Sequence, residues 1–239
     1  MTFGTCSARS RQFGLAGGTG VCAFLLVCAS AQMLRTDLDW LRAPLSFYLI
    51  GPHALWVRGA YFALATALLA LGVGYYRALS PRARSAAPLL MFACGSLGLV
   101  VTALAETNTY LSPPTLEGFI HGVAAQTAFL CTTTAMLLQS WRLREDPLWR
   151  PRFVAAFALA AFCFIALWVQ TLWRDVPRGL TQKLLILAIL YWLGFAASWL
   201  RKSPAPRAAA APLAMAGGPS PALNPQPLHP TNQAAVVRP

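Results

Sequence analysis

The chain has 239 residues, of which 57% are hydrophobic and only 11% are charged. A soluble domain carries about 25% charged residues, so the composition excludes an ordinary water-soluble enzyme, a disordered chain and a disulfide-stapled miniprotein. The formal net charge is +12, which nucleic-acid-binding proteins and membrane proteins with basic loops can share. We therefore expect the chain to lie mostly in lipid.

Six stretches without a charged residue are long enough to cross a membrane as helices. A transmembrane helix needs about 20 apolar residues to cross about 30 Å of hydrocarbon. A backbone in lipid must satisfy its own hydrogen bonds, and these stretches lack the alternation of a membrane β-strand. The sequence therefore predicts an all-α polytopic membrane bundle of six transmembrane helices within residues 13–202. In chain order the stretches are 12–34, 59–76, 85–105, 118–141, 153–173 and 184–200.

The segments that flank the predicted bundle differ from it in composition. Residues 1–12 form a short N-terminal tail, and residues 203–239 are rich in Pro, Ala and Gly with few large apolar side chains. A segment like 203–239 buries too little apolar surface to offset the entropy of ordering. We expect it to be a disordered tail on the same side of the membrane as residues 1–12.

The first apolar stretch has two interpretations. Arg9 and Arg11 precede it and Ala29-Ser30-Ala31 fits a cleavage site, as in a secretory signal peptide. A signal peptide has an apolar core of about 7–15 residues, whereas residues 13–34 are uncharged throughout. An even number of spans also places the basic loops on one side without cleavage. We favour a retained first helix and keep the signal peptide as the alternative.

Basic residues are distributed unequally between the two sides of the predicted bundle. Four fall on the side opposite the termini, namely Arg35, Arg42, Arg174 and Arg178. Loops rich in Lys and Arg stay in the cytoplasm, so we expect both termini there. The net charge thus orients the helices and does not indicate nucleic acid as a partner. Thirteen basic residues fall on the side of the termini: Arg9, Arg11, Arg77, Arg82, Arg84, Arg142, Arg144, Arg150, Arg152, Arg201, Lys202, Arg207 and Arg238.

Polar and ionisable residues gather on the side with few basic charges. Ionisable side chains in a membrane span are costly and often mark a functional site. Gly98, Thr102 and Glu106 share one helix face, which is expected to carry Glu106 toward the bundle interior. We therefore predict a polar pocket that faces outward. Its candidate residues are Ser46, His53, Arg58, Glu106, Asn108, His121 and Lys183.

A structural interpretation of the same residues stays open. Most of them lie within one or two turns of a predicted helix end, where long side chains reach water. Glu106 with Arg58, and Asp175 with Lys183, would then be neutralising ion pairs. Likewise, Ser46 would cap a short helical turn before the second helix.

Two histidines and one carboxylate of the predicted pocket are suitable metal ligands. Imidazole and carboxylate groups bind zinc, and an open position on the metal would hold a reactive water. His53, Glu106 and His121 therefore form a candidate metal site of a membrane-embedded hydrolase at the outer leaflet. The sequence has no His-Glu-x-x-His motif and no nucleophile elbow. No cofactor is assigned, and the spacing fixes no carboxylate to orient a Ser46–His53 pair.

A non-enzymatic role is favoured over the hydrolase. An outward pocket with Arg58, His121 and Lys183 is suited to an anionic headgroup, which makes membrane lipids the expected partners. Gly14 and Gly18 are spaced for close helix packing, either within the chain or in a homo-oligomer. The sequence thus predicts a lipid-handling or membrane-organising protein, with the hydrolase as the alternative.

Three short stretches and the arginine-rich loop 142–152 resemble those of a known family. The resemblance spans residues 13–200 and implies a multi-pass protein of the bacterial inner membrane, but it names no reaction. Relatives often carry an aspartate shortly after the third helix, where this chain reads Glu106-Thr107-Asn108-Thr109. The family is the bacterial six-helix membrane family catalogued as domain of unknown function 998. The stretches that are similar to it are Leu45-Ser46 to Gly51-Pro52, Gly118-Phe119-Ile120-His121-Gly122-Val123-Ala124-Ala125 and Gly179-Leu180-Thr181-Gln182-Lys183.

Overall fold

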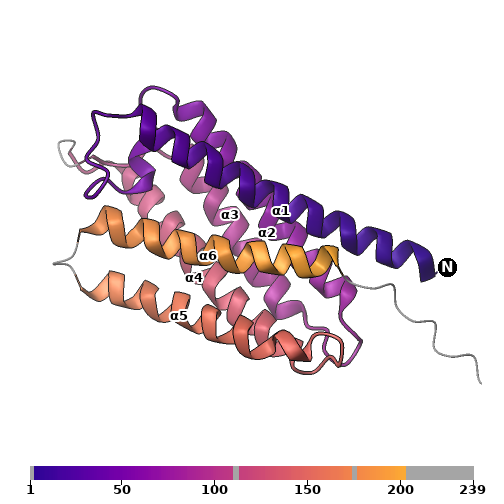
Figure 1. Cartoon of the computed structure of the whole chain (residues 1–239). Coiled ribbons are helices and arrows are strands. Elements are labelled where there is room, and N and C mark those ends of the chain that lie inside the picture. The colour runs from indigo at the N-terminus through magenta and orange to yellow at the C-terminus, as the bar shows by residue number, and fades with distance from the viewer. Residues whose placement is uncertain (1–2, 110–112, 174–176, 203–239) are drawn as a thin grey trace, which may run out of the picture. The chain divides into compact units, whose positions relative to one another are not determined.

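Residues 3–109, 113–173 and 177–202 are described by a computed structural model, and within them the structure consists of helices and turns (Figure 1). Outside these residues lie the segment 203–239, predicted to be a disordered tail, and the two residues Arg174 and Asp175. All six predicted helices are present among the described residues. Local signals set their boundaries: at the start of the fourth helix, for example, the Thr115 hydroxyl accepts a hydrogen bond from the Gly118 amide at 3.0 Å. The elements are α1 (Phe3–Leu34), η1 (Leu45–Leu49), α2 (Ala54–Ala78), α3 (Ala86–Leu104), α4 (Leu116–Leu143), η2 (Arg150–Arg152), α5 (Phe153–Leu172) and α6 (Arg178–Arg201).

The first helix starts earlier than the sequence predicted. It begins at Phe3, so most of the expected N-terminal tail 1–12 is helical, because no proline interrupts the segment. Along α1 the packing is close: a Cβ atom on Gly20 would lie 2.5 Å from the Ala63 carbonyl oxygen of α2. This helix is therefore an integral part of the bundle.

The six long helices pack in a ring. Each contacts its neighbours in sequence, and α1 also packs against α6. The Gly14–Gly18 motif serves this last contact, because a Cβ atom on Gly14 would lie 2.7 Å from the Arg201 amide nitrogen. The motif is therefore used within the chain, which removes the sequence argument for self-association.

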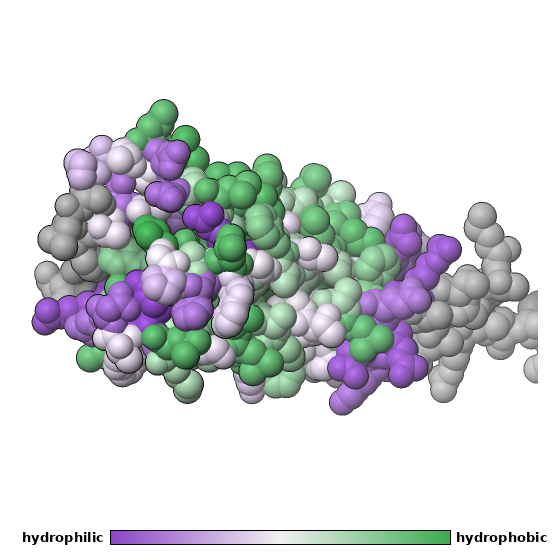
Figure 2. Space-filling view, turned by 90° about the horizontal axis from the view of Figure 1, so that it is seen from above, coloured by the Kyte–Doolittle hydropathy of each residue, from purple (hydrophilic) through white to green (hydrophobic). Residues whose placement is uncertain are grey.

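Five of the helices are long and apolar enough to cross a membrane: α1, α2, α3, α5 with η2, and α6. The fourth helix is long enough, with 28 residues, but is not among them. Its apolar character is diluted by buried polar residues, including Thr133 and Ser140, whose hydroxyls donate to carbonyls of the preceding turn. The prediction of six transmembrane helices is thus not confirmed. In Figure 2 hydrophobic residues cover the middle of the bundle, and hydrophilic residues gather at its two ends.

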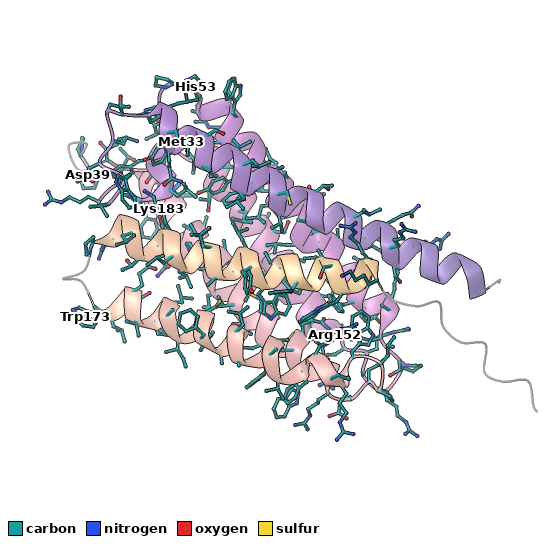
Figure 3. All side chains as sticks on the ribbon, viewed as in Figure 1. Met33, Asp39, His53, Arg152, Trp173 and Lys183 are labelled. Carbon is teal, nitrogen blue, oxygen red and sulfur yellow. The ribbon has the colours of Figure 1, made fainter. Side chains whose placement is uncertain are left out.

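The two ends of the helical bundle differ. One, which we call the capped end, is covered by residues 35–53 and also holds the end of α3, the start of α4, the end of α5 and the start of α6 (Figure 1). The other, the terminal end, holds the start of α1, the end of α6 and the connections 79–85 and 144–152. Figure 3 shows Asp39, His53 and Lys183 at the capped end and Arg152 at the terminal end.

The terminal end is tightly packed. Asp146, which is 5% exposed, accepts hydrogen bonds from the Ser80 amide at 2.8 Å and the Leu148 amide at 3.0 Å. The Trp149 ring is fully buried and packs edge-on against Tyr75. Tyr75 in turn donates to the Ala196 carbonyl of α6 at 2.9 Å. These contacts close the bundle interior at this end.

Candidate functional site

An arginine organises the segment that covers the capped end. Residues 35–53, which we call the cap, begin with Arg35, whose guanidinium binds both Asp37 carboxylate oxygens at 2.7 and 2.8 Å. Its Nη1 donates to the Ile50 carbonyl at 2.6 Å. A planar guanidinium can bond to three oxygens in this way, whereas a lysine cannot. Arg35 thus joins the start of the cap to the turn at Gly51, where φ is +79°.

The cap is attached to the start of α6. The Leu180 amide donates to the Leu41 carbonyl at 2.8 Å, Gln182 accepts from the Leu45 amide at 2.9 Å, and the Lys183 ammonium donates to the Trp40 carbonyl. A Cβ atom on Gly179 would lie 2.6–2.7 Å from backbone atoms of residues 41–43. Four residues of the stretch 179–183 therefore hold the cap in place.

The Arg35–Asp37 pair predicts that the cap loosens in acid. The hydrogen bonds from Arg35 lower the pKa of Asp37 below its ordinary value, so ionised Asp37 stabilises the folded cap. This contribution is complete above the pKa of the unfolded chain and is lost as the pH falls through the lowered pKa. We expect hydrogen-exchange protection at residues 37–43 to fall over that range. Asp37→Asn should give weak protection at all pH values, and a wild-type profile as flat as that of Asp37→Asn would contradict this role.

Beneath the cap lies a cavity of about 560 Å³. Such a volume lies within the range of about 300–1,000 Å³ found for small-molecule sites. Its inner wall is apolar and comes from five helices, with Phe24, Leu64, Leu68, Leu99, Phe129, Ile186, Ile189, Leu190 and Leu193. Its polar lining residues are Ser46, Tyr61, Thr102, Thr107, Asn108, Thr109, His121, Gln126, Thr132, Gln170, Thr171, Arg178 and Gln182.

The exposed lining residues mark the mouth of the cavity. Five lining residues are exposed: Thr109 between α3 and α4, Gly122 and Gln126 near the start of α4, Thr171 near the end of α5, and Arg178 at the start of α6. The mouth therefore lies between these helices at the capped end. Gly122 has no atom within 4 Å of an added Cβ, so the space in front of it is open.

His121 is the polar residue of the cavity with the most constrained geometry. Its side chain is 4% exposed, and its Nδ1 lies 2.9 Å from the Ala105 carbonyl oxygen at the end of α3. A carbonyl can only accept, so Nδ1 carries the proton, and Nε2 of the neutral ring is an acceptor. That Nε2 atom is buried without a hydrogen-bond partner.

Two further cavity residues were not predicted as pocket residues from the sequence. Gln170 of α5 lines the cavity, and its buried Oε1 has no hydrogen-bond partner within the part of the chain that the structure describes. Arg178 stands at the mouth, and no carboxylate is among the described residues that line the cavity. The sequence signal that could have indicated Gln170 is its position near the end of an uncharged stretch. The sequence analysis used the charge of Arg178 to orient the helices and did not include Arg178 among the candidate pocket residues.

The predicted pocket residues fall into two groups. Ser46, Asn108 and His121 line the cavity. Ser46 does not cap its helical turn, since Pro44 occupies that position in η1. Asn108 accepts from the Thr115 hydroxyl at 2.8 Å. The sequence thus placed three residues that the structure brings to one cavity.

The other four predicted residues lie elsewhere. His53 is exposed and packs against the Trp56 ring at 5.0 Å, and Arg58 is half-buried but does not line the cavity. Lys183 donates to the cap and lines a smaller cavity between α1 and α6. Glu106 is exposed because α3 ends at Leu104, so the face shared with Gly98 and Thr102 does not extend to it.

The structure does not assemble the candidate metal site. His53 and Glu106 are exposed while His121 is buried, and among the described residues no group of three His, Cys, Asp or Glu side chains could hold a metal ion. Glu106 and Arg58 are also not among the ion pairs of the described residues, which are Arg35–Asp37, Arg42–Asp39 and Arg144–Glu145. The pair predicted for Asp175 lies outside the described residues.

The part of the chain that the structure describes is all-helical, and its five helices of membrane-spanning length and hydrophobicity are compatible with a multi-pass membrane protein. Residues 19–200 match the family described as Protein of unknown function (DUF998), and the chain belongs to this family. The resemblance predicted from the sequence is thereby confirmed at the level of the family. No curated protein and no solved structure matches the chain. Of the three stretches that carried the resemblance, the first lies in the cap, the second forms the α4 side of the cavity, and the third attaches the cap to α6.

Proposed function

We propose that this protein binds an amphipathic lipid, with the apolar chain in the cavity and the polar head at its mouth. The observation that carries the proposal is the polarity of the cavity, which is apolar along its inner wall apart from Tyr61 and Thr132 and polar at the capped end. Ligand sites of helical membrane proteins are formed between helices from apolar walls and a few polar groups. The mouth lies between helices at the capped end, where a lipid can enter between α4, α5 and α6.

The headgroup is anionic. Arg178 at the mouth offers a guanidinium, which is suited to phosphate and carboxylate groups. The described lining residues include no carboxylate that would repel an anion or hold a cation. Gln126 and Thr171 add polar groups at the same exposed rim.

The protein is a six-span protein of the bacterial inner membrane with both termini in the cytoplasm. The excess of basic residues at the terminal end supports this orientation, and the capped end with the cavity mouth then faces outward. The close packing of α1 against α2 supports a retained first helix. The fourth helix crosses as well, because its buried polar groups face neighbouring helices and not lipid.

The crossing of α4 can be tested by labelling at its two ends. Glu117 and Arg144 are exposed and flank the helix, so cysteines placed there in a cysteine-free background lie on opposite sides if α4 spans. We expect a membrane-impermeant maleimide to label Glu117→Cys from outside intact cells and Arg144→Cys only after permeabilisation. Labelling of both from the same side would contradict the six-span topology.

A hydrolase is the second candidate, and one observation favours it. The Ser46 hydroxyl and the His121 imidazole line the same cavity, and Ala105 orients the imidazole as a histidine base is oriented in nucleophilic catalysis. If the bound lipid is a substrate, Ser46→Ala would cause intact lipid to accumulate in the purified protein. An identical lipid composition in wild type and Ser46→Ala would exclude this role.

Lipid occupancy tests the main proposal. The wild-type protein, purified in a mild detergent without added lipid, should retain one amphiphile per chain in native mass spectrometry. The mass of the retained species should correspond to an anionic lipid. A delipidated protein that rebinds no anionic amphiphile at all would overturn the proposal.

A further inference from the structure

Two residues that line the cavity carry a buried acceptor without a hydrogen-bond partner among the described residues. His121 is 4% exposed, and because its Nδ1 donates to the Ala105 carbonyl, Nε2 of the neutral imidazole is such an acceptor. The Oε1 atom of Gln170 is likewise buried and unpartnered. They come from α4 and α5, the helices that flank the mouth.

An unpaired buried acceptor is costly, and native structures rarely leave one without a donor. A lipid chain offers no donor. A deprotonated phosphate or carboxylate offers only acceptors, so an anionic group alone satisfies Arg178 but neither His121 nor Gln170. An ammonium group would also donate, but together with Arg178 it would set two positive charges against a single phosphate, and the described lining residues include no carboxylate to balance the second. A headgroup hydroxyl donates without adding charge and fits beside an anionic group.

We infer that the cavity recognises anionic amphiphiles whose headgroup carries a free hydroxyl, which donates to His121 Nε2. The inference rests on the lipid-binding function proposed above and narrows it to a chemical class. Arg178 holds the anionic group at the mouth, His121 accepts from the headgroup hydroxyl beside it, and Gln170 accepts from a second donor where the headgroup has one. His121 thus acts as a specificity-determining residue.

Two lipids that differ only in hydroxyl groups test the inference. Phosphatidylglycerol and phosphatidylpropanol with the same chains carry the same phosphodiester charge, but only the first has headgroup hydroxyls. Competition for binding to the delipidated full chain in detergent should favour phosphatidylglycerol by about tenfold or more in the wild type. His121→Leu should reduce this preference to near unity, and Gln170→Leu should reduce it in part. Because the wild-type comparison needs no variant, the test holds even if His121→Leu fails to fold.

The outcomes separate this inference from the proposed function. Hydroxyl recognition is overturned if the wild type binds both lipids with equal affinity and Gly122→Leu, which blocks the mouth, weakens the binding of both. That result leaves the proposed lipid binding intact. If the protein shows no lipid binding that Gly122→Leu weakens, the proposed function itself is overturned. A preference that survives in both His121→Leu and Gln170→Leu overturns the assignment to these acceptors.

Discussion

Gly122→Leu is expected to lower the affinity for the lipid by about tenfold or more without unfolding the protein. Gly122 lies on the face of α4 that also presents Ala125, Gln126 and Phe129 to the cavity. An added Cβ there meets no atom within 4 Å, so leucine fits the helix and projects into the mouth. The measurement is lipid binding to the delipidated protein together with its thermal unfolding midpoint.

Gly59→Leu is the matched control for this experiment. Gly59 is exposed, lies in the second turn of α2 as Gly122 does in α4, and also has no atom within 4 Å of an added Cβ. It does not line the cavity. Equal loss of lipid binding in both variants would show that the effect is general and not a block of the mouth.

Gly179→Val is expected to detach the cap from the bundle. A Cβ at this position would lie 2.6–2.7 Å from backbone atoms of residues 41–43, and backbone cannot rotate aside as a side chain can. Overpacking of this kind costs about 1–3 kcal/mol. The expected result is faster hydrogen exchange at residues 40–50, a lower unfolding temperature and weaker lipid binding, because the cap covers the cavity.

Gly194→Val controls for the valine itself. Gly194 lies in the same helix, and an added Cβ there meets no atom within 4 Å, so Gly194→Val makes the same change of residue type in a helix without the clash. Its cap should exchange as slowly as that of the wild type. If the two variants exchange alike, Gly179 does not hold the cap.

The helices could be predicted from the sequence because their signals are local. Uncharged stretches bounded by charged residues gave the order and approximate limits of the six long helices. Ser46, Asn108 and His121, which were predicted as pocket residues, line one cavity. The end of α3 was missed: its regular face appeared to continue to Glu106, but the helix stops at Leu104.

The cavity could not be predicted because it depends on which helices face one another. His53 seemed equivalent to His121, yet it has a φ of 65° at the start of α2 and is exposed. Lys183 seemed free to bind an anion, yet its ammonium donates to the Trp40 carbonyl, a contact between residues far apart in the sequence. Gln170 and Arg178 line the cavity because of how the helices pack against one another. Residue spacing within one helix does not predict such packing.

The most direct measurement of the central claim is the position of the lipid chain in the protein. A phospholipid with a diazirine at the end of its acyl chain, bound to the purified protein and photoactivated, should label inner-wall residues such as Phe129 and Leu190, which line the cavity. Peptide mass spectrometry identifies the labelled residues. The account predicts inner-wall labelling that Gly122→Leu abolishes and Gly59→Leu preserves. Labelling confined to outward-facing residues such as Leu97 and Phe162, which are 64% and 58% exposed, would contradict it.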